Sequence, residues 1–248
     1  MILVSDFDGT LKRQDVTKKD LQAIEEFRRQ GHIFAIATGR PFHFLQQGLS
    51  RYHVPSDFII ATNGGLIKNK EVIFLSKISY DTMMNLAMFL AQYEDSELIV
   101  SNGLDYSHPI QQISDLEQAR GIPGLQETFF NEASIIHATV DMYSSLIDEQ
   151  SSREFQDIDF LYNTYGAGVI DVVQKGVSKS AAISKVFIEE LNYQKSDIYV
   201  IGNSLNDLDM IRDFKGFAVS DCDEKLLEYT SAIFPDVSTC IEYLLSLN

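Results

Sequence analysis

Asp6 and Asp8 are the residues of this chain best suited to chemistry, because they stand two positions apart at the end of an apolar strand. Side chains at that spacing in a strand point to the same face, so both carboxylates should leave the strand end together. Gly9 follows and allows a tight turn. Two like charges held this close require a cation or a proton between them. An ordinary charged turn is the alternative, because Asp and Gly are common turn residues.

Further polar groups follow other predicted strands. They are Thr38, Gly39 and Arg40 after the second strand, Asn63 and Gly64 after the third, and the segment GNSLND at 202–207 after a later one. Loops at strand ends are polar by default, so each group alone is as consistent with structure as with function. Open α/β sheets place their ligands at the carboxyl ends of their strands. Several such groups in register therefore favour an active site at that edge.

Alternating strands and helices must position these groups. The expected core strands are residues 2–7, 32–39, 58–65, 197–203 and 216–220. The expected core helices are residues 17–31, 42–53, 175–192 and 205–214, one that starts at about Glu224, and one at about 239–247. This alternation predicts the α/β class: a Rossmann-like three-layer core with a parallel sheet covered on both faces.

The middle of the chain has a different pattern. It contains a predicted helix at about 80–93, apolar runs at 97–103 and 134–143, a polar helical segment near 145–156, and two strands at 159–166 and 168–174. The short gap between the last two strands indicates an antiparallel hairpin. We expect residues 79–174 to form an inserted α+β cap domain, and residues 1–78 and 175–248 to form the core.

The composition limits the partners. A formal net charge of −16 argues against nucleic acid and anionic membrane surfaces, whose phosphates favour basic faces. An anionic substrate would instead need a bound divalent cation that reverses the local field. The two cysteines are too few for a disulfide framework, and neither a basic leader nor an apolar run of membrane-spanning length is present. We expect a cytoplasmic protein with reduced thiols.

Four motifs together carry a family resemblance. They are DFDGTL at 6–11, ATGR at 37–40, the lysine of KGVSKS at 175–180, and GNSLND at 202–207. In this order they resemble the motifs of the haloacid dehalogenase superfamily of phosphotransferases, and the insertion resembles the type-2 cap of its Cof-like branch. The DxDG[ST] core of the first motif would arise by chance on the order of once in a hundred chains of this length.

The resemblance implies a role for each motif. Asp6 corresponds to the nucleophile, Asp8 to the acid/base, and Thr38 to the phosphate-binding hydroxyl. Lys179 corresponds to the family's lysine, for which Lys175 is the one nearby rival. Asp207 and its neighbours correspond to the magnesium-binding acidic motif.

The chemistry of these residues agrees with those roles. A phosphate monoester repels an anionic nucleophile, so Asp6 could attack phosphorus only if cations neutralise the charge around it. Mg²⁺ prefers oxygen ligands and usually keeps several waters. We expect its ligands to be Asp6, Asp8 through its backbone carbonyl, Asn203 and Asp207. Asn203 departs from the family pattern, GDxxND, and removes one negative charge from the metal site.

Substrate contacts are expected from both parts of the chain. The core candidates are Gly9, Thr10, Gly39, Arg40, Asn63 and Asn206. In the cap, the polar aromatic residues Tyr106, His108 and Tyr165 could stack on a sugar or a base, although such residues are often ordinary packing. The cap loops show no pattern that identifies a substrate.

The function expected from this reading is magnesium-dependent hydrolysis of a small phosphorylated metabolite, a sugar phosphate or a phosphorylated cofactor, through an aspartyl-phosphate intermediate. Two alternatives stay open. One is transfer of the phosphoryl group to another hydroxyl, as in phosphomutases. The other is a weakly active regulatory protein that binds a phosphorylated metabolite, which the departure at Asn203 suggests.

Overall fold

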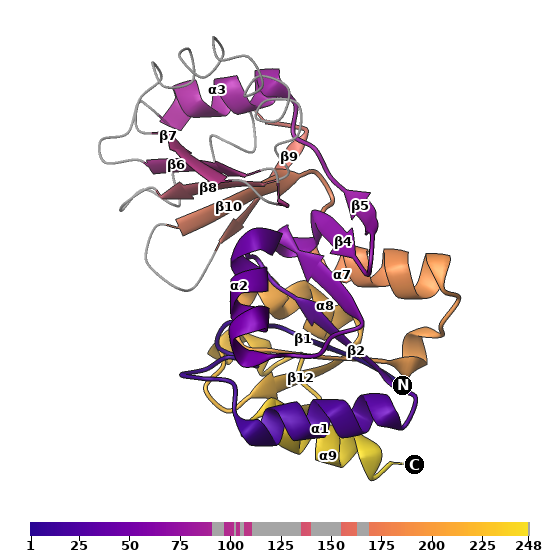
Figure 1. The fold of residues 1–248 in the computed structure, drawn as a ribbon. Coiled ribbons are helices and arrows are strands. Elements are labelled where there is room, and N and C mark those ends of the chain that lie inside the picture. Colours follow the sequence, from indigo (N-terminus) through magenta and orange to yellow (C-terminus); the bar gives the residue numbers. More distant parts are fainter. Residues whose placement is uncertain are drawn as a thin grey trace.

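The chain forms two sheets, and helices pack around the larger one (Figure 1). The computed structural model describes residues 1–90, 97–101, 103–104, 107–110, 135–139, 155–162 and 169–247. Strands and helices alternate through the larger part, so the predicted α/β class is confirmed. No helix among the described residues is long and apolar enough to cross a membrane.

The larger sheet brings distant strand ends to one edge. Its described strands follow the order β13-β12-β11-β1-β2-β3-β4-β5, with bounds Ala232–Phe234, Lys215–Val219, Ile198–Gly202, Ile2–Ser5, Ile33–Ala37, Phe58–Ala61, Leu66–Lys68 and Val72–Leu75. Neighbours from β13 to β3 are parallel, as expected. Ser5 pairs with Ile36 of β2 and Ile201 of β11, so the residues that follow these three strands lie side by side.

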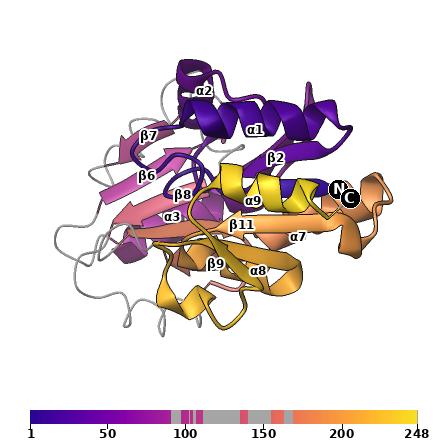
Figure 2. The same cartoon turned by 90° about the horizontal axis from the view of Figure 1, so that it is seen from below.

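Helices cover both faces of this sheet (Figure 2). One face carries α1 (Lys18–Arg29), α2 (Phe42–Tyr52) and α9 (Val237–Leu245), and the other carries α7 (Lys179–Ile183) and α8 (Leu208–Asp213). The first face buries a cluster that includes Phe27, Leu45 and Ile241. The opposite face buries a second cluster that includes Ile183 and Ile211. Because each helix buries its apolar side against the sheet, three layers result.

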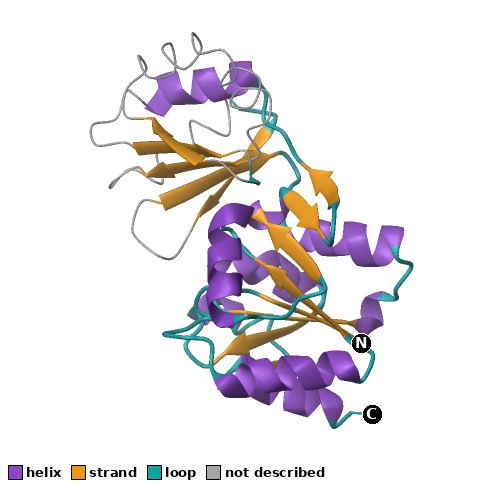
Figure 3. Ribbon diagram, in the orientation of Figure 1, coloured by secondary structure: helices purple, strands orange, loops and turns teal. Residues whose placement is uncertain are grey.

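The second sheet is antiparallel and has the order β7-β6-β8-β10-β9, with bounds Ser107–Ile110, Glu97–Ser101, Ile135–Thr139, Val169–Gln174 and Ile158–Tyr162. Helix α3 (Tyr80–Leu90) lies against the face of this sheet that is turned away from the larger sheet (Figures 1 and 3). The predicted hairpin of β9 and β10 is confirmed, with Phe160 opposite Val172. The chain links the two parts through β5 and through the segment that follows β10.

Three expectations for the core differ from the structure. The antiparallel strands β4 and β5 were not predicted, because they follow β3 without an intervening α-helix and so lie outside the strand–helix alternation. The helix predicted from Glu224 is wrong: only a 3₁₀ turn, Glu224–Leu226, forms there, and β13 follows. The helix that begins at Lys179 continues as a wider π-helical segment, Ser184–Glu190. Most of the predicted helical segment at 145–156 lies outside the described residues.

Candidate active site

The carboxyl edge of the larger sheet carries the predicted site. Asp6 follows β1, Thr38 follows β2, and the loop with Asn203 follows β11. A cavity of about 740 Å³ opens at this edge. The predicted residues that line it are Asp6, Asp8, Thr38, Gly39, Arg40 and Asn206. Residues from strands far apart in sequence therefore face one space, as the parallel topology requires.

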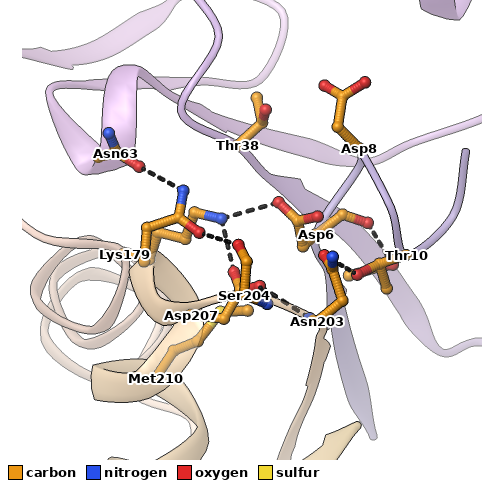
Figure 4. A network of polar contacts seen from close by, with 12 residues as sticks. Asp6, Asp8, Thr10, Thr38, Asn63, Lys179, Asn203, Ser204, Asp207 and Met210 are labelled. Atoms are coloured by element: carbon orange, nitrogen blue, oxygen red, sulfur yellow. Dashed lines mark hydrogen bonds and ion pairs between the residues drawn. The ribbon is translucent and has the colours of Figure 1, made fainter. Parts of the chain in front are cut away.

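Lys179 joins two carboxylates at the base of the site (Figure 4). Its Nζ donates to Oδ1 of Asp6 at 2.8 Å and to Oδ1 of Asp207 at 2.6 Å. All three side chains are buried. Buried charges are stable only when they are paired and hydrogen-bonded. This triad is therefore a compact unit around the strand end of β1, in which one ammonium is shared by two carboxylates.

The start of α7 places Lys179 there. Ser178 caps the helix, and its hydroxyl accepts a hydrogen bond from the N–H of Ala181 at 3.1 Å. Lys179 is the first helical residue and extends toward β1. Lys175, the rival candidate, is 60% exposed and its Nζ lies 3.7 Å from Oδ1 of Asp159. The structure thus brings Lys179, and not Lys175, to Asp6.

Asp207 also organises the loop after β11. Its Oδ2 accepts the backbone N–H groups of Asn203 at 2.9 Å and Ser204 at 3.1 Å. Gly202 makes room for this arrangement, because a Cβ there would lie 2.5 Å from Cγ of Asp207. Both oxygens of Asp207 are therefore engaged by protein donors, one by Lys179 and the other by the loop.

The electrostatics of the triad favour a proton or a second cation near Asp6. Burial and the neighbouring carboxylate of Asp207 raise the pKa of Asp6 to about 7, although Lys179 opposes the shift. Burial alone would lower the pKa of Lys179, but Asp207 and Asp6 raise it above its ordinary value. Lys179 therefore stays charged, and its single charge is shared between two carboxylates.

Asp8 points away from Asp6 (Figure 4), so the predicted common direction of the two carboxylates is wrong: β1 ends at Ser5, and strand alternation does not extend to Asp8, although both residues line the cavity. The guanidinium of Arg40 binds both of its oxygens: Nη2 donates to Oδ1 at 2.7 Å, and Nε makes a short contact with Oδ2. Lys12 lies 3.5 Å from Oδ1. The planar fork of an arginine fits a carboxylate at two points. Asp8 thus stands beside Asp6 in sequence but belongs to a separate charged pair.

Asn63 connects the two sheets. Thr62 and Asn63 both have positive φ, 51° and 52°, a conformation that non-glycine residues rarely adopt. Oδ1 of Asn63 accepts a hydrogen bond from Asn206 at 3.2 Å, and its Nδ2 donates to Oδ2 of Asp171 at 2.7 Å. Asp171 belongs to β10 of the second sheet and lines the cavity. Sequence reasoning missed Asp171, although it is the one charged residue in the apolar run VIDVV.

Three predicted residues face a neighbouring space. Gly9, Thr10 and Asn203 line a second cavity beside the residues 8–17. The N–H of Gly9 donates to the carbonyl of Lys12 at 2.8 Å, which closes the turn after β1. The hydroxyl of Thr10 donates to Oδ1 of Asn203 at 2.9 Å. In this structure these residues hold the first motif against the loop after β11.

The donors near Asp6 fit a hard cation. Within the described ranges, no three His, Cys, Asp or Glu side chains form a metal-binding group. Asp6 and Asn203 nevertheless offer a carboxylate and an amide oxygen on adjacent strand ends. An all-oxygen set with few protein ligands suits Mg²⁺, which keeps several waters. Asp207 binds Lys179 through Oδ1 and the loop after β11 through Oδ2, just as Oδ1 of Asn203 accepts the hydroxyl of Thr10, and its place among the metal ligands stays a prediction.

Two of the three aromatic residues predicted to contact substrate lie outside the residues that the structure describes. Tyr106 and Tyr165 are outside the described residues. His108 belongs to β7. Among the described residues of the second sheet, Ile99 of β6 and Asp171 of β10 line the cavity of about 740 Å³. Of these described residues, they are the two that contribute to the candidate site.

Comparisons with known proteins place the chain in a family. A family profile described as haloacid dehalogenase-like hydrolase matches residues 3–239. A 5-amino-6-(5-phospho-D-ribitylamino)uracil phosphatase of Bacillus subtilis is 24% identical over 238 residues, covering 83% of this chain and 82% of the relative. A phosphoglycolate phosphatase of Archaeoglobus fulgidus is 23% identical over 232 residues, covering 93% and 88%.

A solved structure gives the same result for the fold. It is that of a subclass IIB sugar phosphatase of this superfamily, with a TM-score of 0.78 at 18% identity and coverage of 98% of both chains. At this identity the likeness concerns the fold alone. It extends over the core and the second sheet together.

Proposed function

We propose a mechanism and a substrate class for this chain, which belongs to the haloacid dehalogenase-like hydrolases and is a phosphoric monoester hydrolase. In this proposal it removes the phosphoryl group from a small phosphorylated metabolite, a sugar phosphate or a phosphorylated cofactor. Asp6 carries the group as an aspartyl phosphate between two half-reactions. Mg²⁺ is the proposed cofactor.

One observation carries the proposal: the buried ammonium of Lys179 lies 2.8 Å from the carboxylate of Asp6, a residue that lines the cavity. A carboxylate can attack a phosphate dianion only where positive charge is fixed beside it. Lys179 supplies such a charge, and Asp207 holds it in place at 2.6 Å. A purely structural ion pair would have no need of an adjoining cavity.

In the first half-reaction, an oxygen of Asp6 forms a bond to phosphorus while the bond from phosphorus to the leaving oxygen breaks. Asp8 donates a proton to that oxygen, so the leaving group departs as a neutral alcohol. The Thr38 hydroxyl holds a phosphoryl oxygen, since it lines the same cavity. Asp8 must turn from Arg40 toward the substrate for this step, because the two side chains are paired in the substrate-free structure.

In the second half-reaction, Asp8 takes a proton from a water molecule. The oxygen of that water bonds to phosphorus as the bond between phosphorus and Asp6 breaks. Inorganic phosphate leaves and Asp6 is regenerated. Asp8 thus returns to the protonation state in which it began, and the cycle needs no other reactant.

Asp6, the backbone carbonyl of Asp8, Asn203 and Asp207 would hold the Mg²⁺, the set predicted from the sequence. When bound, the cation would offset the negative charge of the phosphoryl oxygens. Asn203 brings an oxygen without a charge, so we expect weaker metal affinity than a carboxylate there would give. The excess of acidic residues, 36 against 20 basic ones, makes a cation necessary for an anionic substrate.

We place this activity in the cytoplasm, with small metabolites as partners rather than nucleic acid or membranes. The net charge of −16 supports this choice, because phosphate-rich surfaces would be repelled. Cys222 and Cys240 are both free thiols, which agrees with a reducing compartment.

Phosphate release from 4-nitrophenyl phosphate, with magnesium and with a chelator, tests the proposal. Asp6→Asn should lower turnover by a factor on the order of 10⁴ or more, since it removes the nucleophile. Asp81→Asn is the matched control, because it removes one exposed carboxylate from α3. Sugars added as acceptors would reveal phosphoryl transfer. Retained turnover in Asp6→Asn, or none in the wild type, would reject the function.

A further inference from the structure

Arg51 is the one arginine in the described part of the chain that forms no ion pair, although acidic residues outnumber basic ones by 36 to 20. The other described arginines each pair with a carboxylate: Arg13 with Asp221, Arg28 with Asp57, Arg29 with Glu26, Arg40 with Asp8 and Arg212 with Asp213. The guanidinium of Arg51 instead lies 5.4 Å from the centre of the Tyr52 ring. A guanidinium without a carboxylate partner in so acidic a chain calls for an explanation.

One face of α2 lines the cavity of the candidate site. It carries Phe44, Gln47, Gly48 and Arg51, which follow the i, i+3, i+4, i+7 spacing of a single helix face. Phe44, Gln47 and Arg51 are exposed, so this face does not pack against the core. The proposed chemistry gives these side chains no role, and their position allows them to contact a ligand in the cavity.

Gly48 brings this face close to the first motif. A Cβ at position 48 would lie 3.0 Å from Cζ of Phe7, the residue between Asp6 and Asp8. Arg51 follows about one helical turn later. The helix rise and the length of the arginine side chain therefore put its guanidinium on the order of 10 Å from the strand end that carries Asp6. A group at the far end of a small metabolite would lie at such a distance.

The carboxylates that line the same cavity bind other groups of the protein. Asp6 has Lys179 as a donor, Asp8 has Arg40, and Asp171 has Asn63. Asp15 raises the pKa of Tyr52, but it lines the neighbouring cavity beside the residues 8–17. No carboxylate of the described residues forms an ion pair with Arg51, so its charge is available to an anionic ligand.

The position of Arg51 in a helix also has a structural explanation. The last turn of a helix favours a cation, which would account for a positive charge there but not for its place in the cavity lining. Arg29 provides the comparison. It too lies in the last turn of its helix, but it is 73% exposed and pairs with Glu26. The two arginines therefore separate a helix-end role from a ligand-binding role.

We propose that Arg51 binds a second anionic group of the substrate, remote from the phosphate that is removed. This inference rests on the phosphatase function proposed above. The planar fork of a guanidinium fits two oxygens of a phosphate or a carboxylate. The substrates are therefore phosphate esters whose alcohol carries another anion at its far end, on the order of 10 Å from the scissile phosphate. Phe44 and Ile99, which line the same cavity, offer apolar contacts to the part that joins the two anions.

A pair of simple esters tests the inference. 6-Hydroxyhexyl phosphate and hexane-1,6-diyl bisphosphate differ only in the second phosphate, and the two ends of the bisphosphate are equivalent. With excess magnesium, the wild type should have a kcat/KM about tenfold or more higher for the bisphosphate, counted per phosphate group. Arg51→Gln should bring this ratio close to one. The loss should appear in KM rather than in kcat, because the contact is the same in the ground state and the transition state.

Further variants and a shorter pair of esters serve as controls. Arg29→Gln removes the same charge from the end of α1 and should leave the ratio unchanged. Arg51→Glu should lower the ratio below one, because it repels the second phosphate. Each ratio is measured within one preparation, so it does not depend on the fraction of folded enzyme. Ethane-1,2-diyl bisphosphate is too short to reach Arg51, so Arg51→Gln should not change its kcat/KM relative to that of 2-hydroxyethyl phosphate.

The outcomes distinguish this inference from the function on which it rests. Equal kcat/KM values for the two six-carbon esters in the wild type would overturn the inference. A preference that survives in Arg51→Gln, or an equal loss with the two-carbon pair, would overturn it as well. Absence of turnover with every ester, including 4-nitrophenyl phosphate, would instead reject the phosphatase function itself.

Discussion

The ammonium of Lys179 and the carboxylate of Asp207 are 2.6 Å apart, and both side chains are withdrawn from solvent. They stand 28 positions apart in sequence, on two helical segments that pack on the same face of the sheet. Oδ2 of Asp207 accepts hydrogen bonds from two backbone N–H groups of the loop after β11, which fixes this side chain. Its Oδ1 in turn holds the ammonium of Lys179 beside Asp6. The cation that we propose for catalysis is thus held in place by the protein itself.

Lys179→Met should damage both stability and activity. It leaves Asp6 and Asp207 buried without their shared cation, and the loss of one partner of a buried pair typically costs about 3–5 kcal/mol. Chemical denaturation measures the free energy of unfolding, and phosphate release measures activity. Lys175→Met is the matched control, since its partner Asp159 is at the surface. Equal effects of both variants would contradict the assignment of Lys179 as the cation shared by Asp6 and Asp207.

The stability of metal-free protein should depend on pH through Asp6. Its pKa is about 7 in the folded chain against an ordinary value of 3.8, chiefly because of burial. This raised pKa stabilises the fold below the unfolded value, and the stabilisation is lost as pH rises through about 7. With a chelator present, wild-type melting temperature should therefore fall relative to Asp6→Asn between about pH 4 and 7.

Added magnesium should weaken that pH dependence, because a cation favours the ionised form of the carboxylate. Parallel melting curves for wild type and Asp6→Asn across this range, with and without magnesium, would show that Asp6 does not titrate there.

Arg40→Lys should slow turnover more than it destabilises the protein. Lysine retains the charge but lacks the planar fork, so the two-point substrate contact expected from Arg40 is lost once Asp8 has turned toward the leaving group. We expect kcat/KM to fall about tenfold. Arg29→Lys is a matched control, because Arg29 makes a similar two-point pair with Glu26 on the exposed side of α1. Similar losses in the two variants would refute the role of Arg40.

Asn203→Asp should lower the magnesium concentration needed for half-maximal activity. The substitution adds a negative charge to the proposed metal site, which should tighten binding about tenfold. Asn69→Asp adds the same charge at an exposed turn and should leave the requirement unchanged. A magnesium titration of phosphate release measures both, and an unaltered requirement in Asn203→Asp would remove Asn203 from the metal site.

The fold could be predicted from sequence where elements are long and periodic. Strands β1, β2 and β11 are short apolar runs, and α1 begins with a capping box at Thr17 and Asp20. Strands β4, β5 and β13 were missed although β1 and β3 are no longer than β5, because no α-helix separates β3 from β4 and β5, or β12 from β13, and the strand–helix alternation does not indicate them. The helix predicted at Glu224 fails because the cap by Asp223 supports only one 3₁₀ turn.

Some residues of the candidate site could likewise be predicted from the sequence, and others could not. Asp6, Thr38 and Lys179 could be found because each follows or precedes a recognisable element. The contact of Asp171 with Asn63 could not, because it joins residues 108 positions apart through the packing of two sheets. The local signal was a single acidic residue within an apolar strand, and that pattern does not indicate which residue it contacts.

The account depends most on Asp6 as the residue that carries the phosphoryl group. The most direct measurement is to quench the enzyme during turnover, reduce it with borohydride, and map the peptides by mass spectrometry, since reduction converts an aspartyl phosphate to homoserine. The account predicts homoserine at position 6 only when substrate is present, and none in Asp6→Asn. Steady turnover with position 6 unmodified, or with the modification at another carboxylate, would contradict it.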